Sequence, residues 1–139
     1  MTKLESLNPV YSQVKDPELV AVRRRQIVRA AVDLFVEKGF HKTTTREISR
    51  ECGFSIGTLY EYISSKEDVL YLVCDYIHTE VETRLTRALV AHQNGKETLR
   101  QAIGAYFKVM DELQDWVLII YQELQSLPHD LMRHVLRKE

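Results

Sequence analysis

The stretch Thr44–Tyr62, TTREISRECGFSIGTLYEY, decides the fold of this chain, because it predicts two short helices separated by a tight turn. Thr44 and Glu47 have the spacing of a capping box, which marks the start of a helix. Gly53 suits the left-handed turn that would end this helix, and Ser55 can cap the next one. Such a pair is typical of a helix-turn-helix, in which the second helix enters the DNA major groove.

Apolar residues in and just after this stretch fall where they can hold both helices against a shared core. They are Ile48, Cys52, Phe54, Leu59 and Ile63, and Ser49 is small enough for a close helix crossing. The second helix would then face outward with Ser55, Ile56, Gly57, Thr58, Glu61 and Tyr62. Spacing alone leaves an alternative open, a helical binding module without DNA contact in which Gly57 merely accommodates packing.

Helical patterns extend on both sides of this stretch. Residues 1–15 lack periodicity and are expected to form a mobile arm, whereas Asp16-Pro17 has the sequence of a helix start. That helix would end at Gly39, with Phe40 folding back onto it. Ser65 and Asp68 predict the start of a fourth helix, with Lys66 in its first turn.

The second half of the chain predicts further helices. Asn94-Gly95 breaks the fourth helix, a fifth covers about 99–113, and Asp115 is expected to cap a sixth over 116–126. The segment Trp116–Tyr121 also has strand propensity, but no partner strand is apparent. Because it is apolar on every side, it should be surrounded by protein. A seventh helix follows Pro128. The predicted fold is therefore all-α, with an arm (1–15), a helix-turn-helix domain (16–65) and a further helical region (66–139).

Composition excludes several classes of protein. Residues 1–65 carry 10 basic and 8 acidic side chains, and residues 66–139 carry 9 and 12, so the basic bias is modest. No apolar run approaches the about 20 residues of a membrane span or forms a signal peptide, which predicts a cytoplasmic protein. No enzyme motif is present, and the histidines and the two cysteines lack metal-binding spacing. We therefore expect no catalysis, no metal and no cofactor.

The segment Arg24–Leu70 resembles the N-terminal domain of the tetracycline-repressor (TetR) family of regulators. The resemblance rests on four short motifs: Ile27-x-x-Ala-Ala-x-x-Leu-Phe-x-x-x-Gly39-Phe40, Thr44-Thr-Arg-Glu-Ile-Ser49, Gly53-Phe-Ser-x-Gly-Thr-Leu-Tyr-x-Tyr-Ile63 and Ser65-Lys-Glu-Asp68. It implies a ligand-responsive regulator, most often a repressor, on a palindromic operator. The implied DNA contacts are Thr45, Arg46, Ser55, Ile56, Gly57, Thr58, Tyr60, Tyr62 and Lys66. Core packing is the alternative for Tyr60.

The TetR resemblance also implies a ligand-binding and dimerisation domain after the fourth helix. Tyr106, Phe107, Trp116 and Tyr121 are the candidates for lining a pocket for an apolar small-molecule effector, with ordinary core packing as the alternative. Because family members continue with further helices, we expect this chain to be incomplete. Its homodimer interface would then lie mainly in the missing part. Leu131, Val135 and Leu136 would leave an apolar stripe exposed on the last helix.

Overall fold

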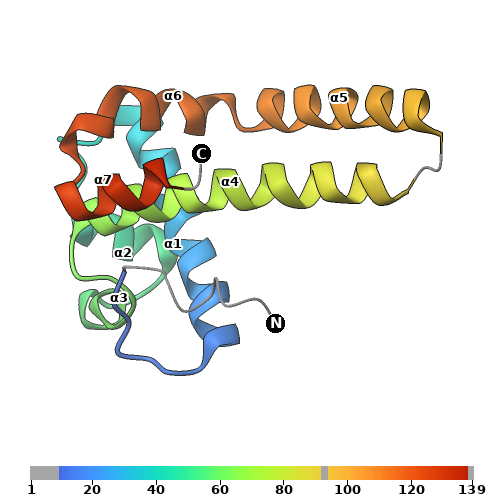
Figure 1. Cartoon of the computed structure of the whole chain (residues 1–139). Helices are drawn as coiled ribbons and strands as arrows, with labels where there is room; N and C mark the ends of the chain where they lie inside the picture. Colours follow the sequence, from blue (N-terminus) through green and yellow to red (C-terminus); the bar gives the residue numbers. More distant parts are fainter. Residues whose placement is uncertain (1–9, 92–93, 138–139) are drawn as a thin grey trace.

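The computed structural model describes residues 10–91 and 94–137, and within these ranges the chain is all-helical, as expected. The helices are α1 (Pro17–Lys38), α2 (Thr45–Cys52), α3 (Ile56–Tyr62), α4 (Lys66–Val90), α5 (Gly95–Glu112), α6 (Gln114–Glu123), the 3-10 helix η2 (Leu124–Ser126) and α7 (His129–Leu136). Helices α1 to α3 gather at one end of the molecule, and α4 and α5 project from it side by side (Figure 1).

Side-chain caps set the helix starts around the predicted helix-turn-helix. Asp16 accepts hydrogen bonds from two N–H groups in the first turn of α1. Thr44 and Ser65 each form a complete capping box at the starts of α2 and α4. Gly39 ends α1 with a φ of 87°, as a glycine can, although its ψ of 156° lies outside the left-handed helical region. The order and approximate bounds of the first four helices are therefore confirmed.

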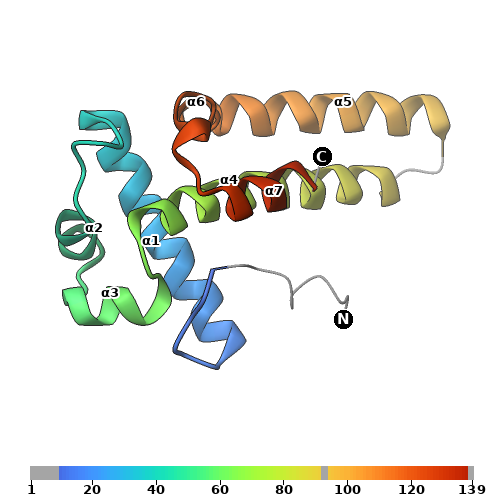
Figure 2. The same ribbon diagram turned by 60° about the vertical axis from the view of Figure 1, so that its left-hand side comes forward.

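One continuous core joins α1, α2 and α3 to the first half of α4. Ile27, Ile48 and Leu59 are fully buried on the first three helices, and Val69 and Leu70 are fully buried on α4. Figure 2 shows α4 crossing α1 next to α2 and α3. The predicted boundary after residue 65 therefore divides the sequence but not the core, because α4 packs on α1, on which both short helices also rest.

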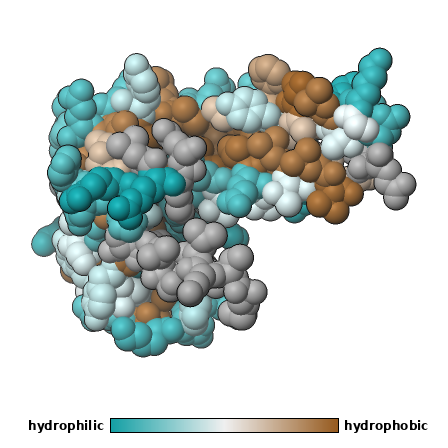
Figure 3. Space-filling view, in the orientation of Figure 1, coloured by the Kyte–Doolittle hydropathy of each residue, from teal (hydrophilic) through white to brown (hydrophobic). Residues whose placement is uncertain are grey.

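The distal half of α4 and its partner α5 form an arm with little burial. Leu89, Val90, Leu99 and Phe107 are all more than half exposed. Apolar side chains are visible along this arm in the space-filling view (Figure 3). The last helix behaves differently from expectation, since Leu131 and Val135 are buried in the core, with α7 packed on α4. The stripe expected to be exposed on α7 is thus covered at these two positions, and the side chain of Leu136 lies outside the described residues.

Two other expectations about the ends of segments are wrong. Residues 10–15 do not form a free arm, because Val10 is buried and the Gln13 N–H donates a hydrogen bond to the Glu61 carbonyl. Residues 1–9 lie outside the described part of the chain. Asp115 does not cap α6, which begins at Gln114 directly after α5 and has no side-chain cap.

The segment Trp116–Tyr121 is helical, but it is not surrounded by protein. Ile119 is buried, whereas Leu118 is 53% exposed and Tyr121 is 82% exposed. The expectation fails because α6 packs on α1 and α4 along one side, and nothing in the described chain covers the other. Across residues 10–91 and 94–137, no helix combines the length and apolar character needed to cross a membrane.

Candidate nucleic-acid interface

Helices α2 and α3 are joined by a turn that their own residues close. Gly53 lies in the left-handed region (φ 73°, ψ 23°), and its N–H group bonds the end of α2. The Phe54 N–H donates to the Ser49 carbonyl at 2.8 Å, which completes the helix end. Ser55 then accepts a hydrogen bond from the Thr58 N–H and caps α3. The two helices are therefore held at a fixed angle by a turn of three residues.

The inner faces of α2 and α3 hold this unit on the core. Ile48, Leu59 and Ile63 are at most 1% exposed, as the sequence pattern predicts. Ser49 is also buried, and its hydroxyl donates to the Arg46 carbonyl at 2.8 Å, so its polar atom is satisfied. Because the apolar side chains face inward, the opposite face of both helices consists of polar groups and one isoleucine.

That outer face carries two pairs of hydroxyl groups. The Thr45 Oγ1 lies 3.0 Å from the Tyr60 Oη, which joins the start of α2 to the middle of α3. The Ser55 Oγ lies 2.9 Å from the Thr58 Oγ1. Tyr60 is 41% exposed, so core packing does not describe its position. Hydroxyl groups at helix starts are suitable partners for phosphate oxygens.

The remaining predicted contacts on this face are open to solvent. Arg46, Ile56 and Gly57 are all exposed. A Cβ added at Gly57 would have only the Ser55 Oγ as a neighbour, at 3.9 Å, so packing inside this chain does not require the glycine. Gly57 instead leaves α3 without a side chain where another molecule could approach its backbone. Lys42 was not among the contacts predicted from the sequence. It is an exposed cation two residues before the Thr44 cap.

Tyr62 is not on the outer face. Its side chain is 4% exposed and belongs to the core cluster, which contradicts the prediction of a groove contact. Tyr62 follows Leu59 by three positions and directly precedes Ile63, so it lies on the buried side of a helix that is only seven residues long.

Lys66 is at the first turn of α4, as predicted, but its ammonium group faces the protein. Nζ donates to the Phe40 carbonyl at 2.7 Å and to the Thr43 carbonyl at 3.0 Å. It also lies 4.3 Å from the centre of the Phe40 ring. These contacts fix the loop between α1 and α2, so Lys66 has an internal role in this structure, and its phosphate contact stays a prediction.

Comparison with known proteins matches this geometry. A model described as bacterial regulatory proteins of the tetR family matches residues 27–71. Residues 27–71 therefore form a domain of the TetR family. It is 36% identical over 136 residues to the HTH-type transcriptional regulator HbdR of Aromatoleum sp. (strain CIB). That match covers 98% of this chain and 58% of HbdR, so the chain spans little more than half of that relative.

Two solved structures of bacterial regulators have the same fold. A regulatory protein from Rhodococcus RHA1 aligns with a TM-score of 0.70 at 26% identity, covering 84% of this chain and 61% of that one. The fatty acid degradation regulator FadR from Bacillus halodurans aligns with a TM-score of 0.67 at 27% identity, covering 90% and 63%. The similarity therefore extends past the helix-turn-helix into the helices that follow it.

The four aromatic residues predicted to line an effector pocket do not enclose a common cavity in the described part of the chain. Tyr106 and Phe107 contact each other on α5 and are 43% and 67% exposed. Trp116 packs on Tyr76, with ring centres 4.9 Å apart, and Tyr121 points to solvent. They lie on two helices and three of them are exposed, so the described structure does not gather them, and a pocket lined by them stays a prediction.

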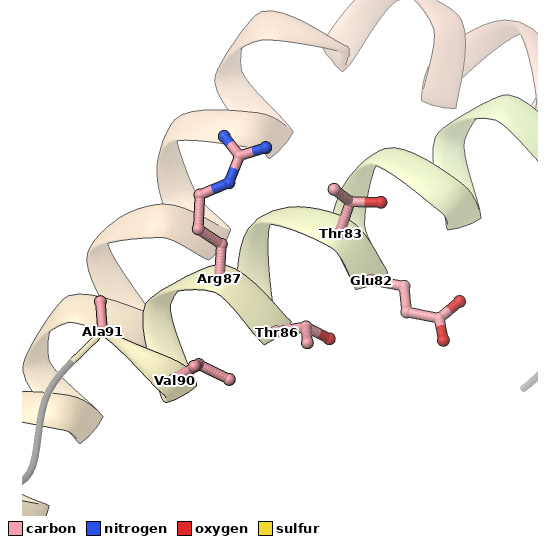
Figure 4. Close-up of a pocket in the computed structure, with 6 residues that line it drawn as sticks. All are labelled: Glu82, Thr83, Thr86, Arg87, Val90 and Ala91. Atoms are coloured by element: carbon pink, nitrogen blue, oxygen red, sulfur yellow. The ribbon is translucent and has the colours of Figure 1, made fainter.

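A surface hollow of about 630 Å³ lies elsewhere, along the distal half of α4. Its lining residues are Glu82, Thr83, Thr86, Arg87, Val90 and Ala91 (Figure 4). Because consecutive turns of a single helix line it, the hollow is an open groove. Among the described residues, no group of three metal-binding side chains comes together.

Proposed function

We propose that this protein is a transcriptional repressor that binds a palindromic DNA operator through α2 and α3. The observation that carries the proposal is the outer face of these helices, which lies opposite their buried apolar side. The polar residues on this face are Thr45, Arg46, Ser55, Thr58 and Tyr60. In this proposal the hydroxyl groups and Arg46 bind phosphates. Gly57 allows a close approach, and Ile56 contacts a thymine methyl group.

The protein acts as a homodimer in this proposal. One helix-turn-helix contacts too few base pairs to select a site in a genome, and a second copy supplies another half-site about one helical turn away. The TetR-family domain at residues 27–71 supports this assembly, since oligomers that bind palindromes share the two-fold symmetry of their sites. Such a regulator would act in the cytoplasm, where it meets its DNA.

Release by a small apolar effector is the second part of the proposal. Two contacts support a connection between the later helices and the DNA-binding end. Glu123 of α6 pairs with His41 at 2.9 Å, and Lys66 of α4 bonds the carbonyls of Phe40 and Thr43. Both contacts hold the loop that precedes α2. A movement of α4 or α6 on effector binding would therefore reach α2 directly.

Fluorescence anisotropy on labelled fragments of the protein's own promoter tests the proposal. We expect preferential binding over random DNA, with an affinity that falls steeply as salt rises. Arg46→Ala should lower the salt slope by about 0.9 per subunit if Arg46 contacts a phosphate. Tyr60→Phe should weaken binding by about fivefold through the loss of one hydrogen bond.

Arg133→Ala is the matched control, because Arg133 is an exposed arginine on α7, away from α2 and α3. It should leave both affinity and salt slope unchanged. Binding that is absent on every promoter fragment would favour the alternative, a helical binding module without DNA contact.

Adding a fatty acyl compound to the preformed complex tests release, since FadR among the matched structures is named as a regulator of fatty acid degradation.

A further inference from the structure

Helix α3 lacks a C-terminal cap of its own. The last four carbonyl groups of a helix have no partners within it. Ile63, which follows α3, is extended (φ −139°, ψ 160°) and does not turn the chain as a glycine cap would, and the last turn contains no basic residue. A helix of seven residues is also too short to be stable by itself. The end of α3 therefore depends on groups from elsewhere in the chain.

The segment Val10–Lys15, called here the N-terminal strap, supplies the first of these groups. The Gln13 N–H donates to the Glu61 carbonyl at 2.8 Å, and the Ser12 hydroxyl approaches the same oxygen at 3.2 Å. Val10 is 4% exposed and packs in the core, which anchors the strap at its first described residue. A carbonyl oxygen has two lone pairs and can accept both bonds.

Arg24 of α1 supplies the rest. Its Nε and Nη2 atoms donate to the Tyr62 carbonyl at 3.3 Å and 3.2 Å, and Nη2 also donates to the Val10 carbonyl at 2.7 Å. One guanidinium group thus joins the strap to the end of α3. Burial lowers the pKa of Arg24, and Asp68 and Asp75 raise it. A positive charge at this end also complements the partial negative charge of the helix C-terminus.

We propose that Arg24 and the N-terminal strap position the recognition helix and so increase the protein's selectivity for its operator. Base contacts need side chains held within a fraction of an ångström, whereas phosphate contacts tolerate movement because they depend mainly on charge. Loosening the end of α3 should therefore reduce binding to the operator more than binding to random DNA. This inference rests on the proposed DNA-binding function. Arg24 and the strap are positioning elements and do not themselves contact bases.

Hydrogen exchange on the free full-length chain tests the positioning directly. The variants are Arg24→Ala, Arg24→Lys and a deletion of residues 1–15. Arg29→Ala is the control, because it removes an equal charge from an exposed position on α1. We expect the amides of α3 to exchange about tenfold faster in Arg24→Ala and in the deletion, with those of α5 unchanged, since the loss is local. Arg24→Lys should recover part of the protection.

Anisotropy with the operator and with random DNA tests the effect on selectivity. Arg24→Ala should weaken operator binding about tenfold and random binding less than about twofold, and Arg29→Ala should change both by the same small factor. If Arg24→Ala unfolds, Ser12→Ala and the deletion decide the question instead.

Unchanged exchange in α3, or equal loss on both DNAs, would overturn the inference. Failure of the wild-type chain to bind any DNA would instead refute the proposed function. In that case the exchange experiment still decides whether the strap holds α3.

Discussion

Replacing Lys66 by methionine separates an internal role for this residue from a phosphate contact. Methionine keeps an unbranched apolar stem against Phe40 but has no hydrogen-bond donor. The variant leaves the Phe40 and Thr43 carbonyls without the ammonium group that bonds them at 2.7 Å and 3.0 Å. The loop between α1 and α2 would then be held less firmly, and with it the start of α2.

The expected loss of stability follows from these contacts. A hydrogen bond to a charged group contributes about 1.5–3 kcal/mol. The cation over an aromatic ring adds about 0.5–1 kcal/mol at a partly exposed site. Two such hydrogen bonds and the cation over the ring would together contribute about 3.5–7 kcal/mol. Because Lys66 is only half-buried and water can replace part of what is lost, we expect less than this sum, about 2–3 kcal/mol.

Urea unfolding and salt-dependent DNA binding measure the two consequences separately. Lys66→Met should be less stable by this amount, and the slope of log affinity against log salt should not change. Lys108→Met, on the exposed side of α5, is the control and should alter neither quantity. A Lys66→Met variant with wild-type stability and a slope reduced by about 0.9 per subunit would refute the internal role and establish a phosphate contact.

Three further predictions concern the stability of the helix-turn-helix, and urea unfolding measures each of them. Leu59→Ala should destabilise the chain by about 3 kcal/mol, since Leu59 is fully buried and leaves a cavity; a loss below about 1 kcal/mol would mean that the site collapses. Gly53→Ala should cost about 1–2 kcal/mol, because the position has a φ of 73° while no atom lies near the added Cβ; an unchanged stability would mean that the turn adopts another conformation. The Lys38 ammonium and then the Thr44 N–H and hydroxyl lower the pKa of Glu47 from about 4.5 to about 2. Its contribution is therefore complete above pH 4.5 and is lost as the pH falls toward 2, so Glu47→Gln should flatten this part of the stability curve, and an identical curve would contradict the pairing.

Local signals in the sequence were enough for the fold class and for the helix-turn-helix. Capping residues act within three or four positions of themselves, so Thr44, Ser55 and Ser65 mark helix starts wherever the helices pack. Gly53 likewise belongs to its turn because of backbone sterics alone. The burial of Ile48 and Leu59 also followed from helical periodicity, which is a local property.

Contacts between distant segments were decided only by the tertiary structure. Tyr62 is buried because α1 packs against α3, and this contact joins segments that are distant in the sequence. Lys66 turns inward because carbonyls 23 and 26 positions earlier lie within its reach. The partnership of Arg24 with Val10 and Tyr62 has the same origin. A charged side chain looks alike in sequence whether it meets solvent, phosphate or backbone, because only folding determines which acceptors surround it.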